Sequence, residues 1–116
     1  MRECEKDPAR LCHILDAIDN ILDIAPQINF AELTNKDIRY FGLVKLLEII
    51  GEAAYMITND FKDNHPATPW KQIVNMRHIL VHGYYKMDKD YILSTIEEDL
   101  RPLRDQIALY LQDYKD

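Results

Sequence analysis

The sequence predicts an all-α fold, an up-down four-helix bundle that forms a single domain over residues 1–116. Apolar residues recur at intervals of three and four along most of the chain, which is the spacing of amphipathic helices. Helix-start signals and breaker residues divide this pattern into four segments. No segment alternates apolar and polar residues as a half-buried strand does. A chain of 116 residues is long enough to bury one modest core without disulfides or metal.

The first helix is expected in "DPARLCHILDAIDNILDIAPQI", residues 7–28. Asp7 is the predicted N-cap, and Pro8 would occupy the first helical position, where its missing N–H costs nothing. The stripe of leucine and isoleucine that follows has helical spacing. Pro26 should kink or end the helix.

The second helix is expected to follow "TNKD", in which Thr34 caps and Asp37 stands three residues later as in a capping box. It should run to about Asp60. Its apolar residues cover more than one face, so we expect it to be the central helix or to be buried by a second subunit.

The third helix should come after a loop, because residues 61–70, "FKDNHPATPW", contain two prolines and an asparagine. Thr68 is the predicted cap, with Pro69 starting the helix and Trp70 anchoring it in the core. Gly83 should end the helix or lie just past its end.

The fourth helix is expected from about Asp88 to Tyr114, where isoleucine and leucine again recur at three and four. Pro102 falls inside this pattern and removes one backbone donor. We therefore expect a bend at that point.

The charge of the chain limits its binding partners. Its net charge is −6 and its pI is near 5.1, so the surface as a whole repels nucleic acids and acidic membranes, and any RNA contact must be local. The apolar runs are too short for a membrane span and the charged N-terminus does not look like a signal peptide, which favours the cytoplasm. Cys4 and Cys12 have no metal-site spacing and are expected to be free thiols.

Residues 76–84, "MRHILVHGY", combine polar side chains with an otherwise apolar helix. Arg77 and His82 are five residues apart, which places them about 140° apart on an ideal helix. They can converge if the helix frays before His82, as Gly83 permits. They can also converge if a two-fold axis brings two copies of the segment into one cleft.

This stretch also carries a family resemblance. "RHILVHGY" fits the R-x4-H-x-Y signature of the HEPN superfamily, and "PWKQIVNMRHILVHGYYKMDKDYI", "IIGEAAYMI" and "EEDLRPLRDQI" resemble its HepT-like branch. The resemblance implies a metal-independent endoribonuclease without a cofactor, whose RNA cleft forms between the subunits of a homodimer. It further implies a toxin that is neutralised by a minimal nucleotidyltransferase antitoxin.

The resemblance also assigns roles to residues of this chain. His82 would be the general acid or base and Arg77 would hold the scissile phosphate, roles that suit a group titrating near neutrality and a permanently charged bidentate donor. Tyr84 would be the residue to which the antitoxin attaches AMP. Tyr85 beside it is an additional or alternative acceptor.

Several neighbouring residues have two interpretations each. His78 is either a surface histidine near the cleft or a direct participant in catalysis. Glu52, in the "GEA" element, either orients Arg77 through a salt bridge or is a solvated helix residue. Gly51 should permit close helix approach. Lys71 and Lys86, together with Lys89, are candidates for a local positive field that would support RNA binding, or they are ordinary surface lysines.

Two other functions compete with the ribonuclease hypothesis. The first is a non-catalytic helical module that binds a nucleotide or RNA and partners a nucleotidyltransferase; the acidity of the chain favours it. The second is a structural dimer in which Arg77 and His82 only fix the interface. That hypothesis leaves unexplained why polar groups whose burial costs free energy are present there.

Overall fold

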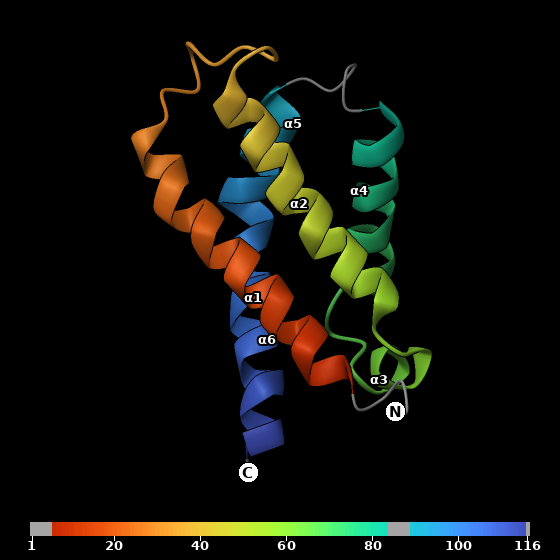
Figure 1. Ribbon diagram of the computed structural model, residues 1–116. Coiled ribbons are helices and arrows are strands. Elements are labelled where there is room, and N and C mark those ends of the chain that lie inside the picture. Colours follow the sequence, from red (N-terminus) through yellow and green to blue (C-terminus); the bar gives the residue numbers. More distant parts are fainter. Residues whose placement is uncertain (1–5, 84–88, 116) are drawn as a thin grey trace.

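The computed structural model describes residues 6–83 and 89–115, and the regular secondary structure in this part of the chain is helical, with no strand. Four long helical segments run alternately up and down (Figure 1). The longer helices are α1 (Asp7–Ile24), α2 (Ile38–Met56), α4 (Trp70–Gly83) and α6 (Leu100–Lys115). The shorter elements are the 3-10 turn η2 (Ala25–Gln27), α3 (Asn59–Asn64), α5 (Lys89–Ser94) and the π turn η4 (Thr95–Asp99), and the last two lead into α6. The predicted all-α bundle is confirmed.

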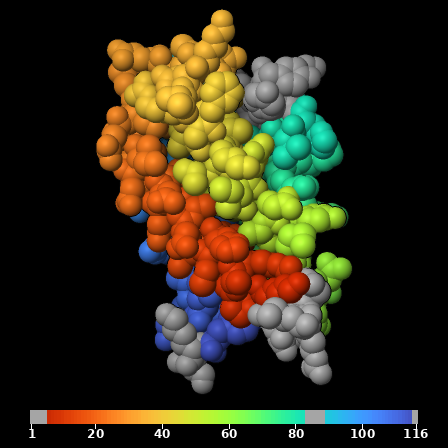
Figure 2. Space-filling view, viewed as in Figure 1, coloured from red at the N-terminus to blue at the C-terminus, as the bar shows by residue number. Residues whose placement is uncertain are grey.

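Helix α2 is the central helix. It packs against α1 on one side and α4 on the other, while α6 packs against α1. In the space-filling view α1, α2 and α4 share one continuous face of the molecule (Figure 2). The core lies behind that face and is built from leucine and isoleucine side chains, among them Leu11, Ile14, Ile18, Leu43, Leu47, Ile50, Leu80, Ile92 and Leu100.

The predicted cap of α1 is wrong by one residue. Lys6 occupies the N-cap and Asp7 is the first helical residue, with only 1% of its surface exposed. The Asp7 carboxylate accepts hydrogen bonds from the backbone N–H of Thr58 at 3.0 Å and from its hydroxyl at 2.7 Å. Asp7 therefore joins the start of α1 to the segment after α2, because these two donors satisfy a buried carboxylate. As expected at Pro26, α1 ends at Ile24.

The predicted cap of α2 is also wrong. Asp37 is the N-cap, and its carboxylate accepts from the backbone N–H of Arg39 at 2.9 Å. The Arg39 guanidinium also pairs with it at 2.8 Å. The Thr34 hydroxyl instead accepts from the backbone N–H of Lys36 at 3.4 Å in the preceding turn. Both side-chain types can cap, and the ion pair with Arg39 favours Asp37.

Helix α2 ends at Met56 rather than near Asp60, and α3 occupies part of the predicted loop. Ile57 is extended, and the Thr58 hydroxyl caps α3 by accepting from the backbone N–H of Phe61 at 3.2 Å. The break occurs where Asp7 binds Thr58. A contact that spans 51 residues thus ends the helix, and local spacing contains no sign of it.

The start of α4 is held from two sides. The Trp70 indole donates to the His65 carbonyl at 2.9 Å, and its ring is buried, as expected of a core anchor. Thr68, which the sequence suggests as the cap, lies two residues before Trp70, the first residue of α4. Its buried hydroxyl donates to Oε1 of Gln106 at 2.8 Å and shares a 2.6 Å hydrogen bond with Tyr110, both on α6. These contacts place the N-terminus of α4 against the C-terminal helix.

The irregularity expected at Pro102 takes the form of the π turn η4, directly before α6. A proline in a regular helix clashes with the carbonyl four residues earlier, which here belongs to Glu98. That carbonyl lies inside η4, where the wider turn changes the local geometry. Within residues 6–83 and 89–115, no helix has the combination of length and apolar character needed to cross a bilayer.

Candidate active site

The site is organised by a close contact between α2 and α4. A Cβ added to Gly51 would overlap the Cβ of Arg77 and lie 3.0 Å from its Cα. Only a residue without a side chain allows the two helices to approach this closely. The close approach that the sequence suggested for Gly51 is therefore present, and it places Arg77 directly over α2.

The Arg77 side chain is oriented by two residues of α2. Its Nε donates to Oε2 of Glu52 in an ion pair, and the two side chains are 31% and 53% exposed. Its guanidinium carbon lies 5.1 Å from the centre of the Tyr55 ring, within the range of a cation–π interaction. Among the described residues, no hydrogen bond engages the two terminal nitrogens. Arg77 is thus held in one direction and retains donors for an anion.

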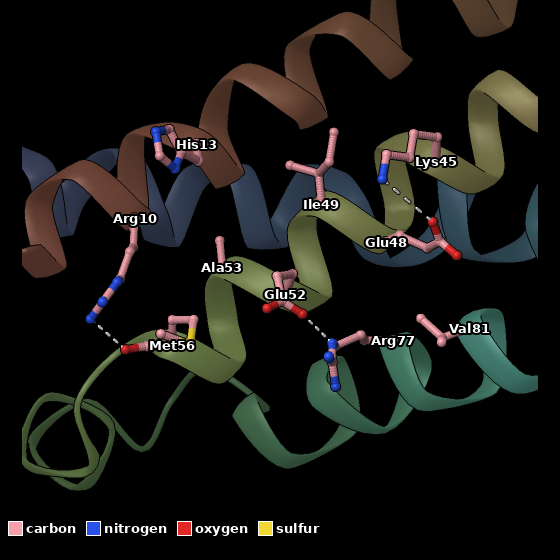
Figure 3. A pocket seen from close by; sticks show the side chains of 10 residues that line it. All are labelled: Arg10, His13, Lys45, Glu48, Ile49, Glu52, Ala53, Met56, Arg77 and Val81. Atoms are coloured by element: carbon pink, nitrogen blue, oxygen red, sulfur yellow. Dashed lines mark hydrogen bonds and ion pairs between the residues drawn. The ribbon is translucent and has the colours of Figure 1, made fainter.

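A surface pocket of about 400 Å³ surrounds this ion pair. Figure 3 shows Glu52 and Arg77 pointing toward one another, with Arg10 and His13 lining the opposite side from α1. Three cationic side chains, Arg10, Lys45 and Arg77, line the pocket together with two carboxylates, Glu48 and Glu52. Each cation has a carboxylate nearby, because Arg77 pairs with Glu52, Lys45 lies 4.0 Å from Glu48 and Arg10 lies 3.9 Å from Asp7. The pocket therefore carries charges of both signs.

Arg77 and His82 do not meet within one chain. Helix α4 continues through His82 to Gly83, so the helix does not fray before His82. His82 instead lies one turn from His78, with ring centres 4.6 Å apart, and both histidines are exposed. Neither of them lines the pocket that holds Arg77. The first way in which Arg77 and His82 could converge, fraying of the helix before His82, is therefore not observed.

The other predicted site residues are two tyrosines and several lysines. Tyr84, Tyr85 and Lys86 lie outside the described residues. Lys89 donates to the carbonyl oxygens of Ala31 at 3.0 Å and Leu33 at 3.1 Å, so it ties α5 to the connection before α2. Lys89 is therefore a structural lysine.

Lys71, by contrast, is exposed on the first turn of α4. Within the described parts of the chain, no three His, Cys, Asp or Glu side chains come together as a metal site would require.

The sequence did not predict three residues that lie near Arg77. Tyr55 contacts the guanidinium, and Arg10 and His13 line the pocket from a helix more than 60 residues away along the chain. Tyr55 could have been found, because it follows Glu52 by three residues and so shares its helix face. Arg10 and His13 carried no such signal, since only the packing of α1 on α2 brings them there.

Comparison with known proteins shows the family of this chain. The model of the family described as ribonuclease HepT-like matches residues 14–109, which include the whole of α2 and α4. The chain belongs to the ribonuclease HepT-like family. The matched segment contains Glu52, Arg77 and His82, so the close contact of α2 and α4 lies inside the HepT-like region.

Individual HepT-like relatives cover nearly the same length. "Probable ribonuclease HepT" of Thermococcus cleftensis is 36% identical over 104 residues, which are 90% of this chain and 93% of the relative. A protein of Methanocaldococcus jannaschii named as a candidate RNase is 31% identical over 101 residues, 87% of this chain and 93% of its own. No solved structure gives a significant match.

Proposed function

We propose that this HepT-like protein is a metal-independent endoribonuclease that acts as a homodimer. The observation that carries the proposal is Arg77, which Glu52 and the Gly51 contact hold in a surface pocket, while His82 stands exposed on another face of the same helix. The membership in a family described as ribonuclease HepT-like, and the names of its relatives, support the same activity.

The geometry of α4 supports the proposed dimer. In a continuous helix Arg77 and His82 diverge by about 140°, so one chain cannot direct both at the same phosphate. A two-fold axis would bring Arg77 of one subunit and His82 of its partner to one cleft. Two exposed apolar residues of α4, Ile79 and Val81, would gain cover from such pairing. The sequence also allowed the second helix, α2, to be buried by a second subunit, and a dimer formed through α4 is compatible with that.

Cleavage would proceed by internal attack. One histidine would remove the proton from a ribose 2′-hydroxyl, whose oxygen then forms a bond to phosphorus as the bond to the 5′-oxygen breaks. The second histidine of the dimer would give a proton to that departing oxygen. Arg77 would bind the non-bridging phosphate oxygens, on which negative charge grows in the transition state. The products would be a 2′,3′-cyclic phosphate and a 5′-hydroxyl.

In the cell we propose that the protein is the toxin of a toxin–antitoxin pair in the cytoplasm, where its RNA substrate and a nucleotide donor are present. Its antitoxin would be a minimal nucleotidyltransferase that attaches AMP to Tyr84. The added phosphate would compete for Arg77 and obstruct RNA. Tyr85 is the second candidate acceptor.

The nuclease is tested by incubating purified protein with total bacterial RNA in excess chelator. We expect discrete fragments with 2′,3′-cyclic phosphate ends from wild type, and none from His82→Ala or Arg77→Ala variants that keep the wild-type mass in solution. Removal of an essential acid or base typically lowers the rate by about 100- to 10,000-fold. A wild-type dimer that is unmodified and leaves the RNA intact would contradict the proposal. It would favour the non-catalytic module that binds a nucleotide or RNA and partners a nucleotidyltransferase.

The modification is tested by mass spectrometry after incubation with ATP and the nucleotidyltransferase. We expect an added AMP on Tyr84 and a Tyr84→Phe variant that stays active in the presence of the partner. A protein that gains no AMP on Tyr84 or Tyr85, although the partner blocks RNA cleavage, would show that inhibition is non-covalent.

A further inference from the structure

A second hollow, of about 730 Å³, adjoins the Arg77 pocket. It lies between the C-terminal end of α2, α3 and the start of α4, and its lining includes Tyr55, Lys62, Lys71 and Val74. Met56 lines both this hollow and the Arg77 pocket, so the two are neighbours on one surface. A ligand extended along this surface could occupy both.

Tyr55 stands at the boundary between the two sites. Its side chain is 55% exposed, although it is a large aromatic residue on the central helix. The Arg77 guanidinium lies over its ring at 5.1 Å from the centre, and the exposed remainder of the side chain borders the hollow. An aromatic ring that is left open beside a phosphate-binding arginine has the character of a stacking surface for a nucleobase.

We propose that this hollow binds one nucleotide of single-stranded RNA adjoining the cleaved bond, with its base stacked on Tyr55. The inference rests on the proposed ribonuclease function and adds the position and the chemistry of a substrate subsite. Within a nucleotide only the sugar separates base from phosphate. An arginine and an aromatic ring that lie 5.1 Å apart can therefore contact the phosphate and the base of a single residue.

The two lysines of the hollow have different roles. The Lys62 ammonium donates to the Tyr55 carbonyl at 3.3 Å, and burial lowers the pKa of this lysine, an effect that Asp7 partly offsets. Lys62 therefore stabilises the last turn of α2, on which Tyr55 stands. Lys71 is exposed at the rim and makes no ion pair with another residue that the structure describes, so it is the cation available to an RNA phosphate.

The test measures RNA binding by fluorescence anisotropy in the inactive His82→Ala background, so that the oligonucleotide stays whole. The oligonucleotide is a short single strand centred on a bond that the wild-type protein cleaves. Tyr55→Ala should weaken binding by between about 5- and 150-fold, the loss of one base stack. Tyr55→Phe and Tyr55→Trp should bind like the parent, because they keep the ring. The matched control is Tyr91→Ala, which removes a partly exposed tyrosine on α5 that lines a different hollow.

Abasic substitutions, made one at a time along the oligonucleotide, locate the stacked base. Removal of the base next to the cleaved bond should weaken binding to the parent, and Tyr55→Ala should then cost nothing further, because the two changes delete the same contact. Lys71→Ala should reduce the slope of log K against log salt by about 0.7 without altering this coupling.

The possible failures can be told apart. Equal losses for Tyr55→Ala and Tyr55→Phe would show that the hydroxyl acts, not the ring, and would overturn the stacking inference. The inference would also be overturned if the losses of RNA affinity from Tyr55→Ala and from each abasic substitution were additive. A Tyr55→Ala variant that loses RNA affinity only because the dimer dissociates would overturn it as well. In each of these cases wild type still cleaves RNA. If wild type neither cleaves nor binds RNA, the proposed function itself fails.

Discussion

At the scale of single residues, the direction of the Arg77 side chain depends on a glycine at position 51, which has no side chain. Gly51 lets the backbone of α4 lie against α2, and this contact brings the Arg77 guanidinium within reach of Glu52 and Tyr55. Gly42, on the same helix, has no atom within 4 Å of the place its Cβ would take. The two glycines of α2 therefore differ in what they do, although the sequence shows each as a helical glycine.

Substitution of these glycines by alanine should have opposite effects on stability. Gly51→Ala should lower the free energy of unfolding by about 1–3 kcal/mol, because the added methyl overlaps Arg77 and forces the helices apart. Gly42→Ala should raise it by up to about 1 kcal/mol, since alanine is the better helix former and has room. Urea unfolding of both variants measures the difference. A Gly51→Ala protein as stable as wild type would show that α4 can shift at no cost.

The same pair of variants separates stability from orientation of the site. If the Gly51 contact positions Arg77, Gly51→Ala should also lower the rate of RNA cleavage at a temperature where the protein stays folded. Gly42→Ala should cleave at the wild-type rate. Loss of cleavage in both variants would point to general disturbance of α2 instead.

At the scale of elements, the ends of α2 are determined by charged and polar side chains. Asp37 caps its start and pairs with Arg39, and the hydrogen bonds from Arg39 lower the pKa of this carboxyl from 3.8 to about 2. Its C-terminal end lies just before Thr58, whose backbone N–H donates to Asp7 and whose hydroxyl caps α3. The second helix is thus shorter than its apolar spacing indicates, because side-chain hydrogen bonds compete with continued helix.

The lowered pKa of Asp37 makes a prediction about pH. Because its pKa is lower in the folded state, the carboxylate stabilises the protein above about pH 4, and this stabilisation is lost as the pH falls through about 2. Asp37→Asn keeps a capping side chain but removes the charge. We therefore expect wild type to be more stable than Asp37→Asn near pH 6, with the difference shrinking as the pH falls toward 2. A difference in unfolding free energy that is constant with pH would contradict the role of the charge.

At the scale of the whole molecule, the proposed mechanism requires Arg77 and His82 to reach one phosphate. The continuous α4 directs them differently, and the Arg77 pocket does not include His82. The residues that line this pocket come from α1, α2 and α4, the helices that share one face of the molecule (Figure 2). A site divided between two subunits accounts for these facts together.

Mixed dimers test this division. A dimer of one wild-type subunit and one His82→Ala subunit keeps a single His82. If the two histidines of the dimer act on one phosphate as base and acid, this mixed dimer should lose cleavage by about 100- to 10,000-fold, because one of the two proton-transfer groups is missing. If each chain carries a complete site of its own, the mixed dimer should keep about half of the wild-type rate. Co-expression with two affinity tags isolates the mixed dimer, and the wild-type and His82→Ala homodimers are the controls.

The sequence by itself determined the all-α bundle, the order of its four main segments and the anchor at Trp70, because the spacing of apolar residues reports directly which face each helix buries. It also singled out Arg77, His82 and Glu52. Local spacing could not predict that Asp7 would end α2 through Thr58, or that Arg10 and His13 would join Arg77. Only the tertiary structure decided these points, together with the exposure of Tyr55 beside Arg77. Each depends on side chains that are distant along the chain or on burial by neighbouring helices, and the period of a single helix contains no information about either.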